Sequence, residues 1–400
     1  MSQALRYGSA FLAVLALANC AGSDVPDNLE PVATGDGYQA QYRTPDVTRK
    51  DAQFLRSAEI NASKCRPLRG GTGGKGSGLA ATALRGERLS RNDLVNIRVS
   101  DDDTFSGDYV VSRDGTLKLP FLSPIRAQGR RTSDIESDIS AQLTAGDYFA
   151  EAPRISVRVA DFASVTVGVS GAVFEPHSVE IGGVRGNEID NRRQGALGAS
   201  SEGRNLSAAL RSAGGVRPDA DISAIEVRRN GTRYVIDMRG VFEGQNASDI
   251  MLLTGDEITV PSRGCFQDNL MRPSPISPAG ISLFMSNLTQ PASGNATSAI
   301  GRDVREVPYG TRYLQAVTDL NCVGGARATS ADRSAVLFSR NPVTKVSVVI
   351  ERDIEDLLRR ADRDDYDPYL LPGDSLACYD STVTNLGEII GVVGLAGLSL

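Results

Sequence analysis

The sequence contains no tryptophan and a single histidine among its 400 residues. Histidine is the commonest general acid–base catalyst, and sugar clefts often stack their ligand on tryptophan. Both shortages argue against an enzyme, although paired carboxylates can act without either residue. The chain also lacks an excess of positive charge, since 43 Lys and Arg face 49 Asp and Glu for a net charge of −6. We therefore expect no nucleic-acid partner.

Two short phrases recur in the chain and indicate a duplicated folding unit. The first copy contains Gly214-Gly215-Val216-Arg217 and then Leu253-Thr254-Gly255-Asp256, and the second contains Gly324-Gly325-Ala326-Arg327 and then Leu371-Pro372-Gly373-Asp374. Between the phrases lie a strand-like stretch that ends in Arg and a second apolar stretch. We expect the two matched aspartates to bond the backbone amides of their own turns; a catalytic carboxylate pair is the alternative.

The apolar run near the N-terminus, residues 11–18, is too short to span a bilayer and is typical of a secretory signal core. It leads into Leu17-Ala18-Asn19-Cys20, which is similar to a bacterial lipobox. In a lipobox the Cys becomes the lipidated first residue of the mature protein, but Asn19 departs from the usual small residue there. We expect residues 1–19 to be a signal peptide and Cys20 to carry acyl chains, with a plain signal peptide as the alternative.

Of the five cysteines, four remain if Cys20 carries lipid: Cys65, Cys265, Cys322 and Cys378. An even number in an oxidising compartment predicts disulfides, and four cysteines allow three pairings. Proximity favours Cys322 with Cys378, which both lie in the second copy of the repeat; four buried free thiols are the alternative. Cysteine spacing matches no zinc pattern, and the acidic run at 362–367 has Asp367 where a calcium loop requires Gly. We expect no metal.

The stretch ahead of the repeats predicts a small α+β unit. Asp114-Gly115 favours a hairpin, and a helix follows in which Thr132 or Ser133 is the cap and Glu136 completes a capping box. The expected elements are a strand at 93–99, hairpin strands at 109–111 and 116–119, a helix at 133–143 and a strand at 155–159.

Similar patterns divide each copy of the repeat into strands and helices. Gly214-Gly215 is expected to end one helix in the left-handed conformation, and Asn230-Gly231 predicts a tight hairpin. The expected elements are strands at 165–173, around 225, around 234 and at 258–260 in the first copy, and helices at 313–320 and 354–360 with strands near 336 and 346 in the second.

The stretch 381–400 carries one charged side chain, Glu388. About 20 helical residues extend about 30 Å, enough for a bilayer core, and glycines at this spacing let neighbouring helices approach closely. We expect a membrane helix, and therefore an oligomer, because a polar pore needs a ring of helices. An apolar tail packed on the preceding domain is the alternative. The residues that we single out in this pore helix are Thr384, Gly387, Glu388, Gly391 and Gly394.

These features together resemble the bacterial outer-membrane polysaccharide export proteins, the Wza-like exporters. Residues 89–99 resemble the family's opening strand motif, with Arg91-Asn92-Asp93 where Pro-Gly-Asp is usual. Residues 109–120 resemble the hairpin of the export domain. Residues 167–176 resemble the start of a sugar-export-associated β-grasp domain called SLBB, with His177 where Gly is common, and the repeated phrases resemble its body. The Pro-rich segment 272–280, with the cysteine pair in the second copy, resembles the capsule-export branch served by ABC transporters.

The resemblance implies an α+β protein built from an export domain, two β-grasp-like SLBB domains and a C-terminal transmembrane amphipathic helix. The implied parts are a signal peptide at 1–19, a lipid-anchored segment at 20–87, an export domain at 88–164, SLBB domains at 165–263 and 264–380, and a membrane helix at 381–400.

The implied function is that of a non-enzymatic lipoprotein without cofactor, an octamer whose C-terminal helices form a channel for capsular polysaccharide across the outer membrane. The implied partners are an inner-membrane co-polymerase and an ABC transporter complex, because the Gly-rich run 70–78 departs from a phosphate-binding loop and no other energy source is visible. The alternatives are a soluble or peripheral periplasmic glycan-binding module, an exporter of released exopolysaccharide, and a carboxylate-based glycan hydrolase using Asp256 and Asp374.

Overall fold

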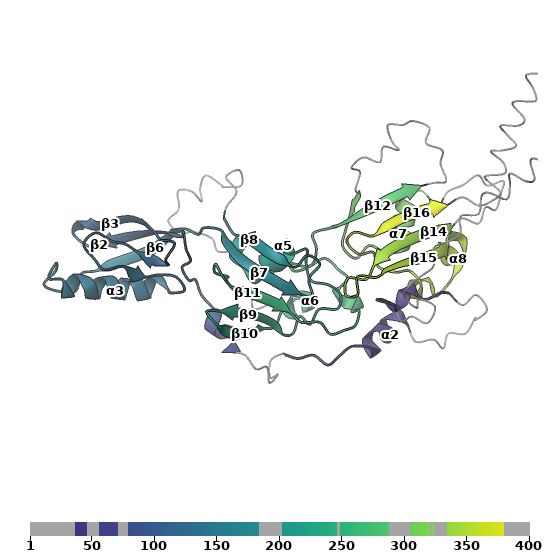
Figure 1. Ribbon diagram of the computed structural model, residues 1–400, viewed down its shortest axis with the longest axis horizontal. Coiled ribbons are helices and arrows are strands. Elements are labelled where there is room, and N and C mark those ends of the chain that lie inside the picture. The colour runs from purple at the N-terminus through teal and green to yellow at the C-terminus, as the bar shows by residue number, and fades with distance from the viewer. Residues whose placement is uncertain are drawn as a thin grey trace, which may run out of the picture. The chain divides into compact units, whose positions relative to one another are not determined.

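The computed structural model describes residues 37–45, 56–70, 79–183, 202–245, 249–287, 305–320, 322–323 and 334–379. They form a mixed α+β fold of several small sheets, divided between two compact units (Figure 1). One unit contains residues 65–279, and the other contains residues 1–64 together with 280–400. No helix of this described part is long and apolar enough to cross a membrane. The expected signal peptide, Cys20 and the whole of 381–400 lie outside the described residues.

The first part of the 65–279 unit is a three-stranded antiparallel sheet with the order β3-β2-β6, and helix α3 packs along it. Ile135, Ile139 and Leu143 of α3 are fully buried against the sheet, as their shared helical face predicts. The elements are β2 (Leu94–Val99), β3 (Asp102–Val110), β4 (Thr116–Leu117), β5 (Ile125–Arg126), α3 (Thr132–Ala145) and β6 (Ile155–Asp161).

Two local predictions for this part are wrong in detail. Asp114-Gly115 does form a tight turn, in which Ser112 N–H donates to the Thr116 carbonyl at 2.8 Å, but β3 pairs with β2 and β4 pairs with β5 instead of with each other. Helix α3 begins at Thr132, so its third residue is Asp134, whose carboxylate accepts the Arg131 N–H at 3.2 Å. The predicted capping residue Glu136 instead accepts the N–H of Val157 at 2.7 Å and ties the helix to β6.

The first copy of the repeat forms a mixed sheet with the order β1-β10-β9-β11-β7-β8, in which β11 runs parallel to β7. Asn230 and Gly231 have φ of 50° and 79° and join β9 to β10, which confirms the predicted hairpin. The elements are β1 (Leu79–Ala80), η3 (Ala81–Leu84), β7 (Val165–Gly171), β8 (His177–Ile181), η4 (Glu202–Arg204), α5 (Leu206–Ser212), β9 (Ile225–Arg229), β10 (Thr232–Ile236), α6 (Gly240–Glu243), β11 (Glu257–Val260) and η5 (Asp268–Leu270).

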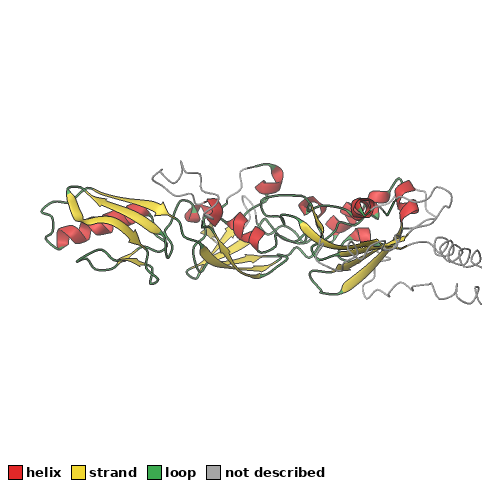
Figure 2. Cartoon of the chain, turned by 90° about the horizontal axis from the view of Figure 1, so that it is seen from above, coloured by secondary structure: helices red, strands yellow, loops and turns green. Residues whose placement is uncertain are grey.

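The second copy forms the sheet β13-β12-β16-β14-β15. Read from β15, this order matches β10-β9-β11-β7-β8 of the first copy, and the parallel pair β16 and β12 corresponds to β11 and β7. The two Leu-x-Gly-Asp phrases therefore precede matching strands, β11 and β16, of a repeated topology, whereas the second Gly-Gly phrase, 324–327, lies outside the described residues. The helices of each copy gather on one side of its strands (Figure 2). The elements are β12 (Ile281–Asn287), β13 (Arg305–Val307), α7 (Tyr313–Asp319), β14 (Ser334–Arg340), β15 (Ser347–Asp353), α8 (Ile354–Arg359), η6 (Arg363–Asp365) and β16 (Ser375–Tyr379), joined by η2 (Ala40–Tyr42) and α2 (Ser57–Ser63) from the N-terminal side.

Glycine is required where the first helix of the repeat ends. Gly214 and Gly215 follow α5 with φ of 76° and 81°, which confirms the predicted left-handed turn. A Cβ on Gly215 would lie 2.3 Å from the backbone nitrogen of Pro278, so the Pro-rich segment closes directly over this glycine. His177, which stands where Gly is common in the family that the sequence resembles, begins β8 and avoids positive φ.

Candidate functional site

The two matched aspartates both sit inside their turns. Asp256 accepts the N–H of Leu253 at 2.8 Å, and Asp374 accepts the N–H of Leu371 at 2.9 Å. Each is only 2% exposed, and the two belong to different compact units. The predicted turn role is therefore confirmed. Both carboxylates are buried and bonded, so neither is the solvent-open group that the hydrolase alternative requires.

The two turns differ in how the buried carboxylate is neutralised. In the first copy Arg229 donates to both oxygens of Asp256, with Nε–Oδ1 at 2.9 Å and Nη2–Oδ2 at 2.6 Å. The pairings of β9 with β11 and of β14 with β16 place Ser339 at the position of Arg229 in the second copy. Ser339 bonds Asp374 but carries no charge, so burial raises the pKa of Asp374 to about 7.

The N-terminal segment, residues 37–45, completes the second copy of the repeat. The hydroxyl of Tyr42 donates to Ser339 at 2.9 Å, directly beside the Asp374 turn. The side-chain amide of Gln39 donates to the Tyr369 carbonyl and accepts the Tyr369 N–H, both at 2.9 Å. The side chains of Gln39 and Tyr42 are almost wholly buried. A segment more than 300 positions away in the chain is thus part of the core of this unit, and no local sequence signal predicts it.

Arg352 on β15 holds the N-terminal segment in place. Its Nη2 donates to the carbonyls of Gln41, Tyr42 and Arg43 at 2.9, 3.4 and 3.0 Å, and its Nε donates to the carbonyl of Tyr366. Burial lowers the pKa of Arg352 to about 10, against the opposing effect of neighbouring acidic groups. The guanidinium therefore stays charged at neutral pH and caps the carbonyls at the end of η2.

A buried ion pair joins the three-stranded sheet to the first copy of the repeat. Arg204 Nη1 donates to Asp93 Oδ1 at 2.7 Å, and the two side chains are 1% and 0% exposed. Asp93 also accepts the N–H groups of Ser90 and Ala163, while Arg204 donates to the carbonyl of Leu252 at 3.1 Å. Burial raises the pKa of Asp93, and the bond to Arg204 opposes that shift. Every polar atom named here has a partner, which makes the junction specific in geometry.

Asp93 belongs to the opening motif singled out in the sequence. The preceding Asn92 adopts φ of 67°, which asparagine tolerates and which suits the position where Gly is usual in the family that the sequence resembles. The motif therefore turns the chain into β2 and delivers the Asp93 carboxylate to the junction. The sequence around Arg204 does not indicate this role, because its partner Asp93 lies more than a hundred positions away in the chain.

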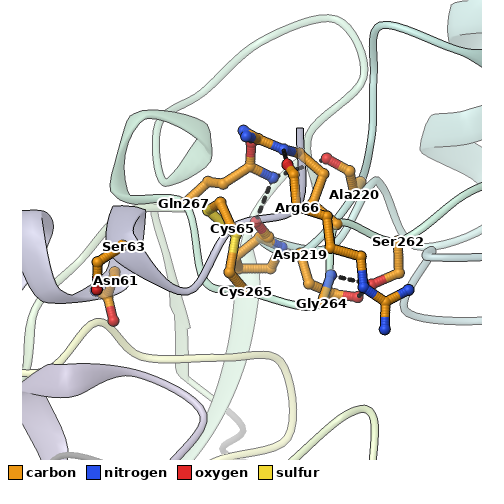
Figure 3. Close-up of a disulfide and its surroundings, with 12 residues drawn as sticks. Asn61, Ser63, Cys65, Arg66, Asp219, Ala220, Ser262, Gly264, Cys265 and Gln267 are labelled. Carbon is orange, nitrogen blue, oxygen red and sulfur yellow. Dashed lines mark hydrogen bonds between the residues drawn. A yellow bond between two sulfur atoms is a disulfide. The ribbon is translucent and has the colours of Figure 1, made fainter. Parts of the chain in front are cut away.

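Both pairs of cysteines are joined in the structure. Cys322 bonds Cys378 with a Cα–Cα distance of 6.2 Å, and Cys65 bonds Cys265 at 4.8 Å. Figure 3 shows the second of these beside Arg66 and Gln267. Arg66 N–H donates to the Arg263 carbonyl at 3.1 Å, so the chain is tied at the point where it enters the 65–279 unit. The sequence leaves three pairings open, and this is the one the structure adopts.

No cluster of three or more His, Cys, Asp or Glu side chains suited to a metal ion occurs among the described residues. The acidic run considered for calcium has structural partners: Asp367 accepts the N–H of Leu314 at 2.8 Å, and Asp362 pairs with Arg360. These side chains cap α7 and fix the loop before β16.

The part of the chain that contains the three-stranded sheet is similar to a known protein family. Residues 82–160 match the family described as "Polysaccharide biosynthesis/export protein", a transport family without known catalytic activity. A stretch of 116 residues is 30% identical to the "Exopolysaccharide production protein ExoF" of Rhizobium meliloti (strain 1021). That match covers 24% of this chain and 27% of the relative, so the chain spans well under two thirds of the relative's length. The sheet β3-β2-β6 with α3 therefore lies in the stretch that is similar to the polysaccharide biosynthesis/export family.

Proposed function

We propose that this chain is a lipid-anchored exporter of capsular polysaccharide that assembles into an oligomeric channel at the outer membrane. The observation that carries the proposal is the match of residues 82–160 to the polysaccharide export family. Two copies of one α+β topology follow this domain, and we interpret them as β-grasp-like SLBB domains that build the channel wall.

The export domain and the first copy of the repeat are suited to act as one rigid piece. The Asp93–Arg204 pair is wholly buried, and the Thr254 N–H of the repeated turn donates to the Ser90 hydroxyl of the export domain at 3.2 Å. Breaking a buried ion pair leaves an uncompensated charge, so this junction resists hinge motion. Rigid subunits suit a ring with a fixed lumen, through which a polymer moves by weak repeated contacts.

Both expected membrane elements adjoin the same compact unit. The N-terminal segment begins shortly after Cys20 and is pinned by Arg352, and β16 ends at Tyr379, immediately before 381–400. We propose that acyl chains on Cys20 and the stretch 381–400 attach this unit to the outer membrane. An octameric ring, an inner-membrane co-polymerase and an ABC transporter complex belong to the same proposal.

The test uses cells that lack the chain and receive either the full chain, a chain ending at residue 380, or the Cys20→Ser variant. Surface polymer is then measured with a labelled antibody or lectin, with immunoblots of outer-membrane fractions as the control for protein level. We expect the full chain to restore surface polymer and the shortened chain to fail. Restoration by the shortened chain at the normal rate would exclude 381–400 as the pore.

Export of a released exopolysaccharide is the second candidate, because the Rhizobium relative is named for exopolysaccharide production. The two candidates differ in where the polymer ends up. Polymer measured on washed cells supports capsule export, whereas polymer found only in the medium supports the second candidate.

A further inference from the structure

The most unusual backbone position in the export domain is Phe121. Its φ is 61°, in the left-handed region that suits Gly, Asn or Asp, and among the described residues it is the one aromatic residue there. Its side chain is also 77% exposed, the highest value for any large apolar residue of the described part. An aromatic ring is thus held in water by a strained backbone. Such strain persists where the surrounding structure enforces it and is concentrated at functional sites.

The loop that carries Phe121 is anchored on both sides. It connects β4 to β5 and is flanked by Pro120 and Pro124, while the neighbouring Leu119 and Ile125 are buried. The N–H of Ser123 donates to the side chain of Gln142 on α3 at 3.0 Å. The position of the exposed ring is therefore fixed by the fold.

A second exposed aromatic residue lies against this loop. The hydroxyl of Tyr148 donates to the carbonyl of Phe121 at 3.4 Å, and 46% of Tyr148 is exposed. The Tyr148 ring packs edge-on against the buried Phe105, with centroids 5.4 Å apart. A Cβ on Gly146 would lie 2.6 Å from this ring, so the glycine leaves room for it. The fold therefore fixes the position of the Tyr148 ring as it fixes that of Phe121.

We infer that Phe121 and Tyr148 form a stacking site for one pyranose ring of the exported polymer. The inference rests on the proposed function. A pyranose presents a face of C–H groups that packs on an aromatic ring and an edge of hydroxyls that needs polar partners. Phe121 offers the ring, while the Tyr148 hydroxyl oxygen can still accept a hydrogen bond and the Gln142 amide nitrogen can donate one. Because the chain has no tryptophan, exposed Phe and Tyr are the rings available for stacking.

A single stacking contact per subunit suits transport better than a deep cleft. An aromatic side chain has only two rotatable side-chain bonds, so it provides contact area with little loss of conformational freedom. The polar groups around Phe121 also favour a sugar over an apolar protein surface, which would bury the ring among apolar neighbours.

The test exploits the missing tryptophan. Phe121→Trp in the full chain introduces the sole indole, whose emission reports on contact with a ligand. The probe is surface polysaccharide purified from the producing cells and shortened to oligosaccharides by mild acid. We expect a saturable change in emission, and at least tenfold weaker oligosaccharide binding by Phe121→Gly than by the parent chain, measured by calorimetry.

Phe121→Gly also separates a binding role from a structural one. Gly relieves the strain at φ of 61°, so we expect this variant to melt at the same temperature as the parent or higher. Phe284→Ala, which removes another exposed ring on β12, is the matched control and should leave oligosaccharide binding unchanged. A lower melting temperature for Phe121→Gly would identify a structural role and overturn the inference.

The remaining outcomes distinguish this inference from the proposed function. If the parent chain binds no oligosaccharide, or Phe121→Gly binds it as the parent does, the stacking site is wrong while export by the full chain still stands. If Phe121→Gly binds oligosaccharide normally but loses a co-purifying inner-membrane protein, Phe121 is a protein-docking residue instead. Failure of the full chain to restore surface polymer would count against the proposed function itself.

Discussion

The stability of the unit that contains the second copy of the repeat should fall as pH rises from 5 to 8, because of Asp374. This carboxyl is 2% exposed and its pKa rises from 3.8 to about 7, chiefly through desolvation by burial. A folded-state pKa above the unfolded value means that the folded state holds its proton more tightly. The stability due to the protonated group is complete below pH 3.8 and is lost as pH rises through 7.

The size of the effect follows from the same shift. Raising a pKa from 3.8 to about 7 corresponds to a difference on the order of 4 kcal/mol between low and high pH, most of it gained or lost between pH 4 and 7. In the first copy of the repeat Arg229 pairs with the buried Asp256 carboxylate, so this turn is the internal reference. The turn of Asp374 is therefore the place where this pH dependence is measured.

Hydrogen exchange read by mass spectrometry resolves the two units in the full chain. After correction for intrinsic exchange rates, peptides from 39–45 and 371–379 should lose protection between pH 5 and 8, while peptides around 253–260 should keep it. Asp374→Asn cannot ionise and should reduce this pH dependence, leaving the part due to Asp367, whose pKa burial raises to about 6. Asp256→Asn is the control, because it leaves Arg229 buried without its partner and should lower protection at both pH values. A parent chain with equal protection of 371–379 at pH 5 and 8 would refute the reasoning.

Three further predictions concern the buried ion pair of Arg204, the glycine turn after α5 and the disulfide between Cys65 and Cys265. Arg204→Met leaves Asp93 buried without its cation and should lower the free energy of unfolding of the 65–279 unit by about 3–5 kcal/mol, measured by urea denaturation. Gly215→Ala forces a Cβ to 2.3 Å from a backbone atom at φ of 81° and should lower the melting temperature markedly or abolish soluble expression. Replacing Cys65 and Cys265 together by Ser opens a loop of 200 residues and should cost about 5 kcal/mol in calorimetry on the chain-entropy estimate.

The first two of these predictions have an internal control. Gly255→Ala shares a positive φ but meets no atom within 4 Å, so it should cost far less than Gly215→Ala. Replacing Asp93 by Asn in the Arg204→Met background removes the stranded charge and should recover part of the lost stability. If the double variant is as unstable as the single one, the charge is not the cause.

The features that local sequence predicts are those set by local chemistry. Asn230-Gly231 and Gly214-Gly215 adopt positive φ as expected, because few residues tolerate that conformation. The repeated Leu-x-Gly-Asp phrases form matching turns, because an aspartate in that position bonds its own backbone. Alternation and helical periodicity place α3 and the strands around it, since they report which face is buried.

The features that escaped prediction depend on partners far away in the chain. The turn at Asp114-Gly115 was recognisable, but the partner of each flanking strand is chosen by the whole sheet. Arg204 meets Asp93, and Tyr42 meets Ser339, across separations that leave no periodic trace. Phe121 reads as one more apolar residue in the sequence, and only its backbone angle and exposure single it out.

Electron microscopy of the full chain, extracted from outer membranes in detergent, tests the central claim most directly. We predict a closed ring of identical subunits with a water-filled passage along its axis and with detergent bound around the ends formed by 381–400. Monomeric particles, or rings without a passage, would contradict the proposal that this chain is a channel for polysaccharide.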